Sequence, residues 1–384
     1  MSRDTAALID LAALRHNLNR VRSLAPAQKI LALVKADAYG HGLIPAARAL
    51  SEADCLGVAH LDEAFELRDS GITTPILILE GAFDVRELQQ ISQQQFRMVI
   101  HSIEQVDMLE TTRLMKPLSV WLKIDTGMNR LGVELKDVDE CIERLQVSGK
   151  VADITLITHF ACSDEPQHPL NKLQLDHFLQ ATQKYSFPRS MANSGGILFH
   201  STSHFDWVRP GIILYGASPA SETDGKQIGL KPVMTLRSEI IAIRAVHKGE
   251  SVGYGCRWIA ERDSVIGVVA IGYGDGYPRH AINGTPVLVN GQRVPLVGAV
   301  SMDMITVDLT ELSTSVNVGD PVILWGESLP VEEIAKYTDT ICYELLCQMT
   351  RRVNRIYLEI QNGESVAGDA TVFASTLLNR EEYI

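Results

Sequence analysis

Short apolar runs alternate with amphipathic helical patterns between Leu11 and Leu214. Leu11, Leu14, Leu18 and Val21 share one helix face before the first run. Repeated strand–helix units of this kind predict a parallel sheet. The expected strands are Ile30–Val34, Cys55–Ala59, Pro75–Leu79, Arg97–Ile100, Ser119–Ile124, Ile154–Thr158, Ser190–Ala192 and Trp207–Leu214. Because about eight such units close a barrel, the count favours an α/β fold with a TIM-like (β/α)8 barrel over an open, doubly wound sheet.

The pattern changes after the turn-forming stretch 218–226. Strands now follow one another at short intervals, and Asn290-Gly291 predicts a type I′ hairpin turn. The expected strands are Met234–Val246, Ser264–Ile271, Thr285–Val289, Arg293–Val297 and Pro321–Leu324. One helix is expected over Val331–Val353, with the arginines at 351, 352 and 355 on a solvated face. We therefore predict a barrel domain over residues 1–225 and a C-terminal mostly-β domain over residues 226–384.

Composition narrows the range of functions. The 384 residues carry a formal net charge of -12, which disfavours a nucleic-acid binder because phosphates attract basic surfaces. The six cysteines include no CxxC pair, as expected for a reduced protein. Neither a signal peptide nor a membrane span is expected, nor a metal site, since HExxH and close Cys/His sets are missing. The sequence therefore indicates a cytoplasmic protein that acts on a small molecule.

Lys35 directly follows the first apolar run. Side chains at the carboxyl ends of barrel strands line the active site. An amine that is removed from water there loses its proton more readily and can form a Schiff base with a carbonyl, either of a substrate or of pyridoxal phosphate (PLP). Lys35 taken by itself also fits the alternative of a solvated lysine that ends a strand.

Three further strand ends carry groups that bind anions. Arg130 could hold a carboxylate with two hydrogen bonds, although a surface ion pair is the alternative. Ser194 precedes two glycines at the start of a predicted helix, where phosphates bind. Arg209 and Gly211 follow the eighth expected strand, near the place where barrels often hold phosphate.

These residues stand within motifs that resemble the alanine racemase family. VKADAYGHG, LKIDTGMNRLG, THFA, ANSGG, VRPGIILYG, VGYG, IGYGDG, SMDM and CYELLC occur in the family's order, from about Leu8 to about Tyr357. The resemblance implies an N-terminal (β/α)8 barrel, a C-terminal β domain and head-to-tail homodimers with shared active sites. It also implies that the extreme N-terminus packs with the second domain.

The resemblance implies a role for each matching residue. Lys35 would bind PLP covalently and act as one base. Tyr254, from the other subunit, would act as the second base on the opposite face of the substrate. The remaining cofactor contacts would come from Tyr39, Ser194, Gly211, Ile212 and Tyr343 at the phosphate, His159 beside the ring and Arg209 at the ring nitrogen.

Substrate binding would fall to Arg130 and the backbone of Met302, again by resemblance. Lys123 matches a lysine that is carbamylated in many members and braces the arginine. Tyr273 matches a tyrosine of the substrate channel. Asn129 departs from the glycine that many members carry, and the tail Ala367–Ile384 is unassigned.

The implied activity is PLP-dependent interconversion of L- and D-alanine, with D-alanine supplied to peptidoglycan. Two alternatives stay open: a serine or broad-specificity amino-acid racemase, and a non-catalytic PLP-binding protein. The second alternative resembles the barrel but lacks the β domain, so the presence of Tyr254 and Met302 argues against it.

Overall fold

A computed structural model describes residues 4–361 and 364–367 of the chain, and within them eight parallel strands close into a barrel. The strands are β2 (Lys29–Leu33), β3 (Cys55–Val58), β4 (Ile76–Ile78), β5 (Arg97–Ile100), β6 (Leu118–Lys123), β7 (Val151–Ile157), β8 (Arg189–Ser190) and β9 (Trp207–Val208). The register closes where Ile30 of β2 pairs with Val208 of β9. The predicted barrel is therefore confirmed.

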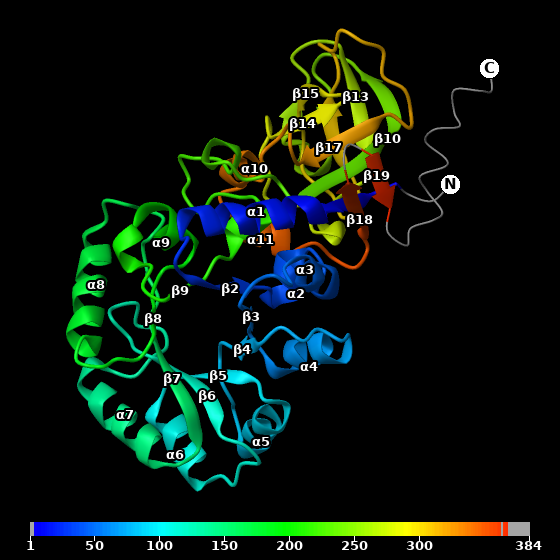
Figure 1. Ribbon diagram of the computed structural model, residues 1–384. Helices are drawn as coiled ribbons and strands as arrows, with labels where there is room; N and C mark the ends of the chain where they lie inside the picture. Colours follow the sequence, from blue (N-terminus) through cyan, green and yellow to red (C-terminus); the bar gives the residue numbers. More distant parts are fainter. Residues whose placement is uncertain (1–3, 362–363, 368–384) are drawn as a thin grey trace.

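Helices cover the outside of the barrel (Figure 1). They are α1 (Leu11–Leu24), α3 (Leu43–Ala49), α4 (Leu61–Asp69), α5 (Val85–Gln94), α6 (Ile103–Thr111), α7 (Val138–Val147), α8 (Pro169–Thr182) and α9 (Ser194–Phe199). The segment labelled α2 (Lys35–Gly40) is instead a turn with left-handed backbone that follows β2. Leu14, Leu18 and Val21 are buried on one face of α1, as their spacing predicts. Inside the barrel, the indole rings of Trp121 and Trp207 pack edge to face, with their ring centroids 5.2 Å apart.

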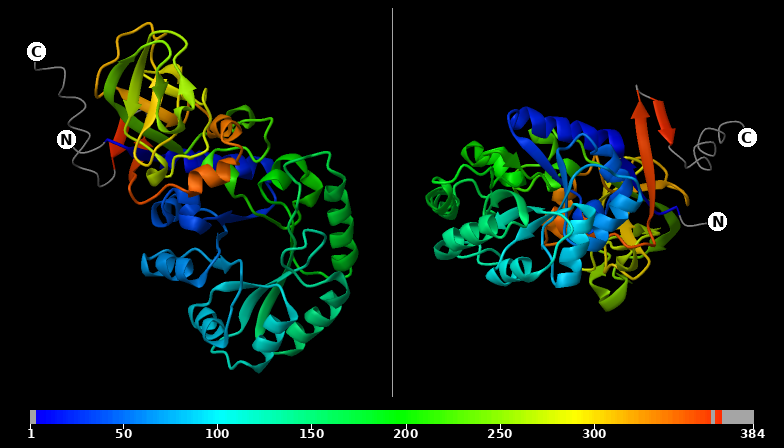
Figure 2. Two further views of the ribbon diagram at one scale, coloured as in Figure 1. Left: turned by 180° about the vertical axis from the view of Figure 1, so that it is seen from behind. Right: turned by 60° about the horizontal axis from the view of Figure 1, so that its bottom comes forward.

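The second domain is built mainly of antiparallel strands beside the barrel (Figures 1 and 2). Its strands are β10 (Met234–Val246), β11 (Ser251–Val252), β12 (Trp258–Ile259), β13 (Ser264–Val269), β14 (Pro286–Val289), β15 (Gln292–Pro295), β16 (Ile305–Asp308), β17 (Pro321–Trp325), β18 (Asn354–Gln361) and β19 (Glu364–Ala367). The first strand of the chain, β1 (Ala6–Asp10), also belongs to this sheet, between β10 and β18.

Two local features of this domain test the sequence predictions. Asn290 and Gly291 join β14 to β15 with φ of 50° and 76°, the positive values that a type I′ turn requires. The single helix expected over Val331–Val353 is wrong, because the chain forms two short helices, α10 (Val331–Tyr337) and α11 (Cys342–Cys347). The break contains Asp339 at φ 46°, a left-handed conformation that interrupts a right-handed helix.

One apolar core joins the two domains, with buried residues from both. None of the described helices is long and apolar enough to cross a lipid bilayer. All but the first residue of the unassigned tail, Ala367–Ile384, lies outside the described residues.

Candidate active site

Lys35 begins a turn of unusual hand at the carboxyl end of β2. Ala36, Asp37, Ala38 and Tyr39 all have φ of 53–54°, so the backbone makes a left-handed turn without glycine at these positions. A left-handed conformation costs a residue with a side chain roughly 1–2 kcal/mol. The surrounding structure must therefore hold this segment, residues 36–40, which we call the lysine turn.

Hydrogen bonds from nearby side chains hold the lysine turn. The Asp37 carboxylate accepts from the Leu43 amide at 2.8 Å. The His41 Nδ1 lies 3.0 Å from the Ala38 carbonyl and 2.9 Å from the Tyr39 carbonyl, and since carbonyls only accept, Nδ1 carries the proton. Burial lowers the pKa of His41 to about 4, so the imidazole is neutral.

The lysine turn places the Tyr39 hydroxyl against the segment that follows β9. The Gly211 amide donates to the Ser194 hydroxyl at 3.0 Å, and a Cβ on Gly211 would lie 2.5 Å from the Tyr39 hydroxyl oxygen. The rings of Tyr39 and Tyr343 are 6.1 Å apart. Burial raises the pKa of both hydroxyls, which therefore stay protonated and can donate. The hydroxyls of Ser194 and Tyr39 thus lie beside the backbone of Gly211, a position where only glycine fits. Together with the backbone of Ile212, these groups form a cradle suited to a phosphate.

Arg209 is a buried cation, 3% exposed, that follows β9. Its guanidinium donates to the Ser190 hydroxyl and the Thr158 carbonyl, both at 2.7 Å, and to His159 Nδ1 at 3.1 Å. Burial lowers the pKa of Arg209 to about 9, which still leaves it charged at neutral pH. Burial and the neighbouring charge of Arg209 keep the pKa of His159 well below its usual range. His159 is therefore neutral and accepts from Arg209.

Positive charge gathers around Lys123 at the end of β6. Burial, followed by the charges of Arg209, Arg130 and Lys35, lowers the pKa of the Lys123 amine to about 7, against a smaller opposing effect of Asp125. Buried cations require compensating negative charge. A ligand with a phosphate, a carboxylate or both fits this site, and an aldehyde on that ligand could react with the Lys35 amine.

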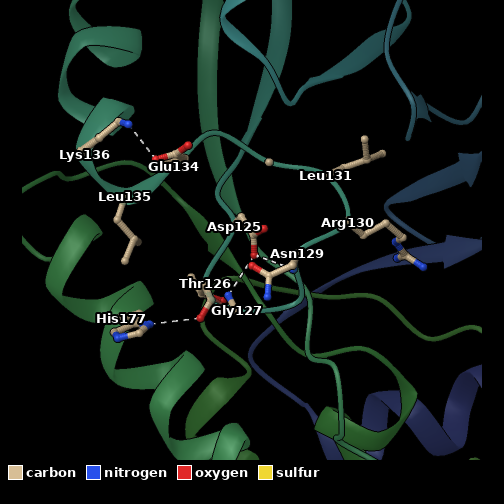
Figure 3. A pocket seen from close by; sticks show the side chains of 11 residues that line it. Asp125, Thr126, Gly127, Asn129, Arg130, Leu131, Glu134, Leu135, Lys136 and His177 are labelled. Carbon is tan, nitrogen blue, oxygen red and sulfur yellow. Dashed lines mark hydrogen bonds and ion pairs between the residues drawn. The ribbon is translucent and has the colours of Figure 1, made fainter.

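Arg130 lies on the loop that follows β6, which borders an open depression of about 780 Å³. Asp125 folds this loop by accepting from the amides of Gly127, Met128 and Asn129 at 2.9, 3.0 and 3.2 Å. Figure 3 shows the Arg130 side chain pointing away from these residues, toward neighbouring strands. Asn129 has φ of 54°, which asparagine tolerates better than most residues, so it can replace the family's glycine.

Tyr254, Tyr273 and Met302 form a second group on loops of the β domain, and they are 71%, 40% and 52% exposed. A Cβ on Gly272 would lie 2.5 Å from the Met302 carbonyl oxygen, so the loops of Tyr273 and Met302 touch. Among the described residues, neither Tyr254 nor Met302 has a hydrogen bond, ion pair or ring contact with Lys35.

The predicted site residues therefore form two half-sites. The barrel half-site lies at the barrel mouth and includes Tyr343, which α11 of the second domain brings beside Tyr39. The other half-site, on loops of the β domain, contains Tyr254, Tyr273 and Met302.

Arg352 and Arg355 do not lie on a solvated helix face, and that prediction is wrong. Arg352 follows α11 and contacts the carboxylates of Asp303 at 2.6 Å and Asp275 at 3.2 Å, the latter fully buried. Arg355 lies on β18 and pairs with Asp37 of the lysine turn at 3.0 Å. Their acidic partners are distant in sequence, so the basic residues alone did not reveal these ion pairs.

Comparisons with known proteins agree with this geometry over most of the chain. Residues 9–219 match the sequence family described as alanine racemase, N-terminal domain, and residues 233–357 match alanine racemase, C-terminal domain. The biosynthetic alanine racemase of Escherichia coli O6:H1 is 52% identical over 354 residues, which cover 92% of this chain and 98% of the relative. That of Salmonella typhimurium has the same identity and coverage.

Solved structures give the same result. The biosynthetic alanine racemase from Pseudomonas aeruginosa superposes with a TM-score of 0.90 at 46% identity, covering 93% of this chain and 99% of that structure. The alanine racemase from Acinetobacter baumannii gives a TM-score of 0.89 at 41% identity, covering 93% of this chain and 100% of that structure.

Proposed function

The chain belongs to the alanine racemase family and interconverts L- and D-alanine, and we propose that its two half-sites, from two subunits, form each active site. The observation that carries this proposal is the separation of Lys35, in a cationic barrel mouth, from Tyr254, which is 71% exposed on another domain. The D-alanine product is supplied to peptidoglycan. We further propose that the enzyme works in the cytoplasm. We also propose that the boundary between its two domains lies between residues 225 and 226.

We propose that the barrel half-site holds PLP, since its residues suit each part of that molecule. Lys35 would bind the aldehyde, and the cradle at Gly211 would bind the phosphate. Bound PLP withdraws electrons from the Cα of an attached amino acid and so makes its proton easier to remove. The other contacts would come from Tyr39, Ser194, Ile212 and Tyr343 at the phosphate and His159 beside the ring.

Arg209 would face the ring nitrogen and set the type of reaction. A guanidinium only donates hydrogen bonds, so it holds an acceptor nitrogen in the unprotonated form. Its contacts with Ser190, Thr158 and His159 fix its position in the barrel. An unprotonated ring withdraws electrons less strongly, which favours simple proton exchange over transamination.

Racemisation requires one group to remove the Cα proton and another to deliver a proton to the opposite face. We assign Lys35 to one face and Tyr254 of the partner subunit to the other. Ile259 and Ile282 of the β domain are also highly exposed, at 56% and 58%, and a hydrogen bond from Asn283 to the Arg257 carbonyl at 2.9 Å joins their two segments. Exposed apolar side chains that gather on one part of a surface are typical of an interaction site, which supports contact with a second copy of the chain.

Arg130 and the partner's Met302 backbone would bind the substrate carboxylate. The neutral Lys123 amine can add CO2 to give a carbamate anion and one released proton, which places a negative charge beside Arg130. That anion would hold the Arg130 guanidinium in place with charge-assisted hydrogen bonds. We therefore propose that Lys123 is carbamylated and acts as a positioning residue.

Subunit complementation tests the shared site. Lys35→Ala and Tyr254→Phe should each be inactive as homodimers. Random exchange between equal amounts should restore activity at about one quarter of the sites, because half the dimers are mixed and each has one intact site. The assay is loss of the Cα proton from L-alanine in heavy water, and borohydride reduction should fix PLP on Lys35 of the Tyr254→Phe chain.

One mixture serves as the control. Tyr254→Phe mixed with a tagged copy of itself should stay inactive. If mass spectrometry shows exchanged dimers and no activity returns, Tyr254 acts within its own chain or is not the base. L-serine, run in parallel, measures whether the enzyme discriminates between alanine and serine.

A further inference from the structure

Strand β18 of the second domain reaches the lysine turn of its own chain. Arg355 Nε donates to the Gly40 carbonyl at 2.7 Å, and its Nη2 contacts the Asp37 carboxylate at 3.0 Å. The Arg355 side chain is 19% exposed, so the contact is partly shielded from water. One guanidinium thus holds two residues of the turn, one through its backbone and one through its side chain.

The Asp37 carboxylate carries this contact further. One oxygen faces Arg355, while the other accepts from the Leu43 amide at 2.8 Å, at the start of α3. The Gly42 amide also donates to the Asp37 carbonyl at 2.9 Å. Arg355 therefore holds Asp37 in place, and Asp37 in turn holds the backbone at Gly42 and Leu43, just after the turn.

The second domain also packs closely against Gly40 of the turn and against Gly42, which lies two residues after it. A Cβ on Gly40 would collide with the Leu346 carbonyl of α11, and one on Gly42 would collide with the Tyr357 hydroxyl of β18. Arg355 and Tyr357 are two residues apart, so they lie on the same face of β18. These packing contacts limit the space around the turn. Among the residues that the structure describes, two charged side chains contact it directly: Arg355 of the second domain, and Glu63 of α4, whose carboxylate accepts from the Ala36 amide at 2.7 Å.

We propose that Arg355 is a positioning residue that keeps the lysine turn left-handed and thereby holds the Tyr39 hydroxyl at the cofactor phosphate. This inference rests on the proposed PLP site. Four residues in a disfavoured conformation return to the ordinary backbone region unless contacts prevent it. Tyr39 is the last of the four, so relaxation of the turn would withdraw its hydroxyl from Gly211.

The test uses the full-length protein, with PLP for one measurement and without it for the other, and three variants. Arg355→Ala removes both contacts. Arg355→Lys can keep the ion pair with Asp37 but lacks the planar fork that also reaches the Gly40 carbonyl. Arg351→Ala removes the same charge from an exposed neighbour and serves as the matched control.

Two measurements separate a positioning role from a general loss of stability. The first is the rate at which visible absorbance is lost when holoenzyme is diluted into buffer with a PLP trap. The second is hydrogen–deuterium exchange of the peptide that spans residues 36–43, in cofactor-free protein. Arg355→Ala should raise both rates about tenfold or more, Arg355→Lys less, and Arg351→Ala should match the wild type.

The outcomes distinguish the inference from the function on which it rests. If wild-type Lys35 is not fixed to PLP by borohydride, the proposed cofactor site fails. If wild type binds PLP there and Arg355→Ala leaves either rate unchanged, the positioning role is wrong. Should Arg355→Ala fail to fold, Asp37→Asn removes the carboxylate charge that Arg355 contacts in the same chain. This variant must then raise both rates for the proposal to stand.

Discussion

Lys123 should take up CO2 reversibly, and the carbamylated fraction of Lys123 should rise with pH. A pKa of about 7 leaves roughly nine in ten Lys123 amines neutral at about pH 8, against about 0.4% for an ordinary lysine with a pKa near 10.4. Only the neutral amine attacks CO2, so the reactive fraction is about 200-fold larger than usual. Because the pKa is lowered, acidification through about pH 7 protonates the amine and removes the carbamate.

The assay is ¹³C NMR of wild-type enzyme equilibrated with labelled bicarbonate. A carbamate carbonyl signal should grow as pH rises from about 6 to about 8, across the pKa of Lys123. Lys123→Ala should abolish the signal. It should also raise KM for alanine by about tenfold, since Arg130 loses an anionic partner.

Lys136 supplies the control for this experiment. It lies at the same depression as Arg130, but its side chain is 72% exposed and its hydrogen bond to Glu134 raises its pKa, which keeps it protonated. Lys136→Ala should therefore retain the full carbamate signal. A signal that survives in Lys123→Ala, or that does not change with pH over this range, would refute the reasoning.

Two further substitutions probe the barrel half-site. Gly211→Ala places a methyl group 2.5 Å from the Tyr39 hydroxyl oxygen, so PLP should dissociate about tenfold faster than from wild type, as measured by trapping the released cofactor. An unchanged rate would remove Gly211 from the phosphate cradle. Arg209→Glu should slow racemisation about 10²-fold and raise side transamination, measured as pyruvate formed per turnover. If the ratio of the two reactions stays constant, Arg209 does not set the protonation of the PLP ring nitrogen.

The barrel could be predicted from sequence because its signal is local and repeated. Each buried strand is a short apolar run, and each outer helix shows one apolar face. Counting these strand–helix units therefore predicted the closed sheet of eight strands. The weakest expected strand was Trp207–Leu214, which ends at Val208. Pro210 cannot donate to a strand ladder, and Gly211 leads into a short 3-10 helix at Ile212, so the apolar residues that follow are buried without forming a strand.

The lysine turn could not be predicted from its own residues. Alanine and tyrosine disfavour left-handed backbone, so the segment Ala36–Tyr39 contains no local signal for four such residues in succession. The contacts that stabilise the turn come from the adjacent His41 and from Arg355, which is 315 residues from Gly40 in sequence. The position of Lys35 after an apolar run pointed to a reactive amine, but only the motif's resemblance to a family pointed to Tyr39.

The segment over residues 352–355 connects both half-sites. Arg352 holds Asp275 and Asp303 on the loops of Tyr273 and Met302. Arg355, three residues later, holds the turn that bears Lys35 of the same chain. A barrel without the second domain would therefore lack Tyr254 and would also lose the contact that supports its own lysine turn. In the proposed arrangement, the second domain would support the cofactor site of its own chain and would supply the second base to its partner.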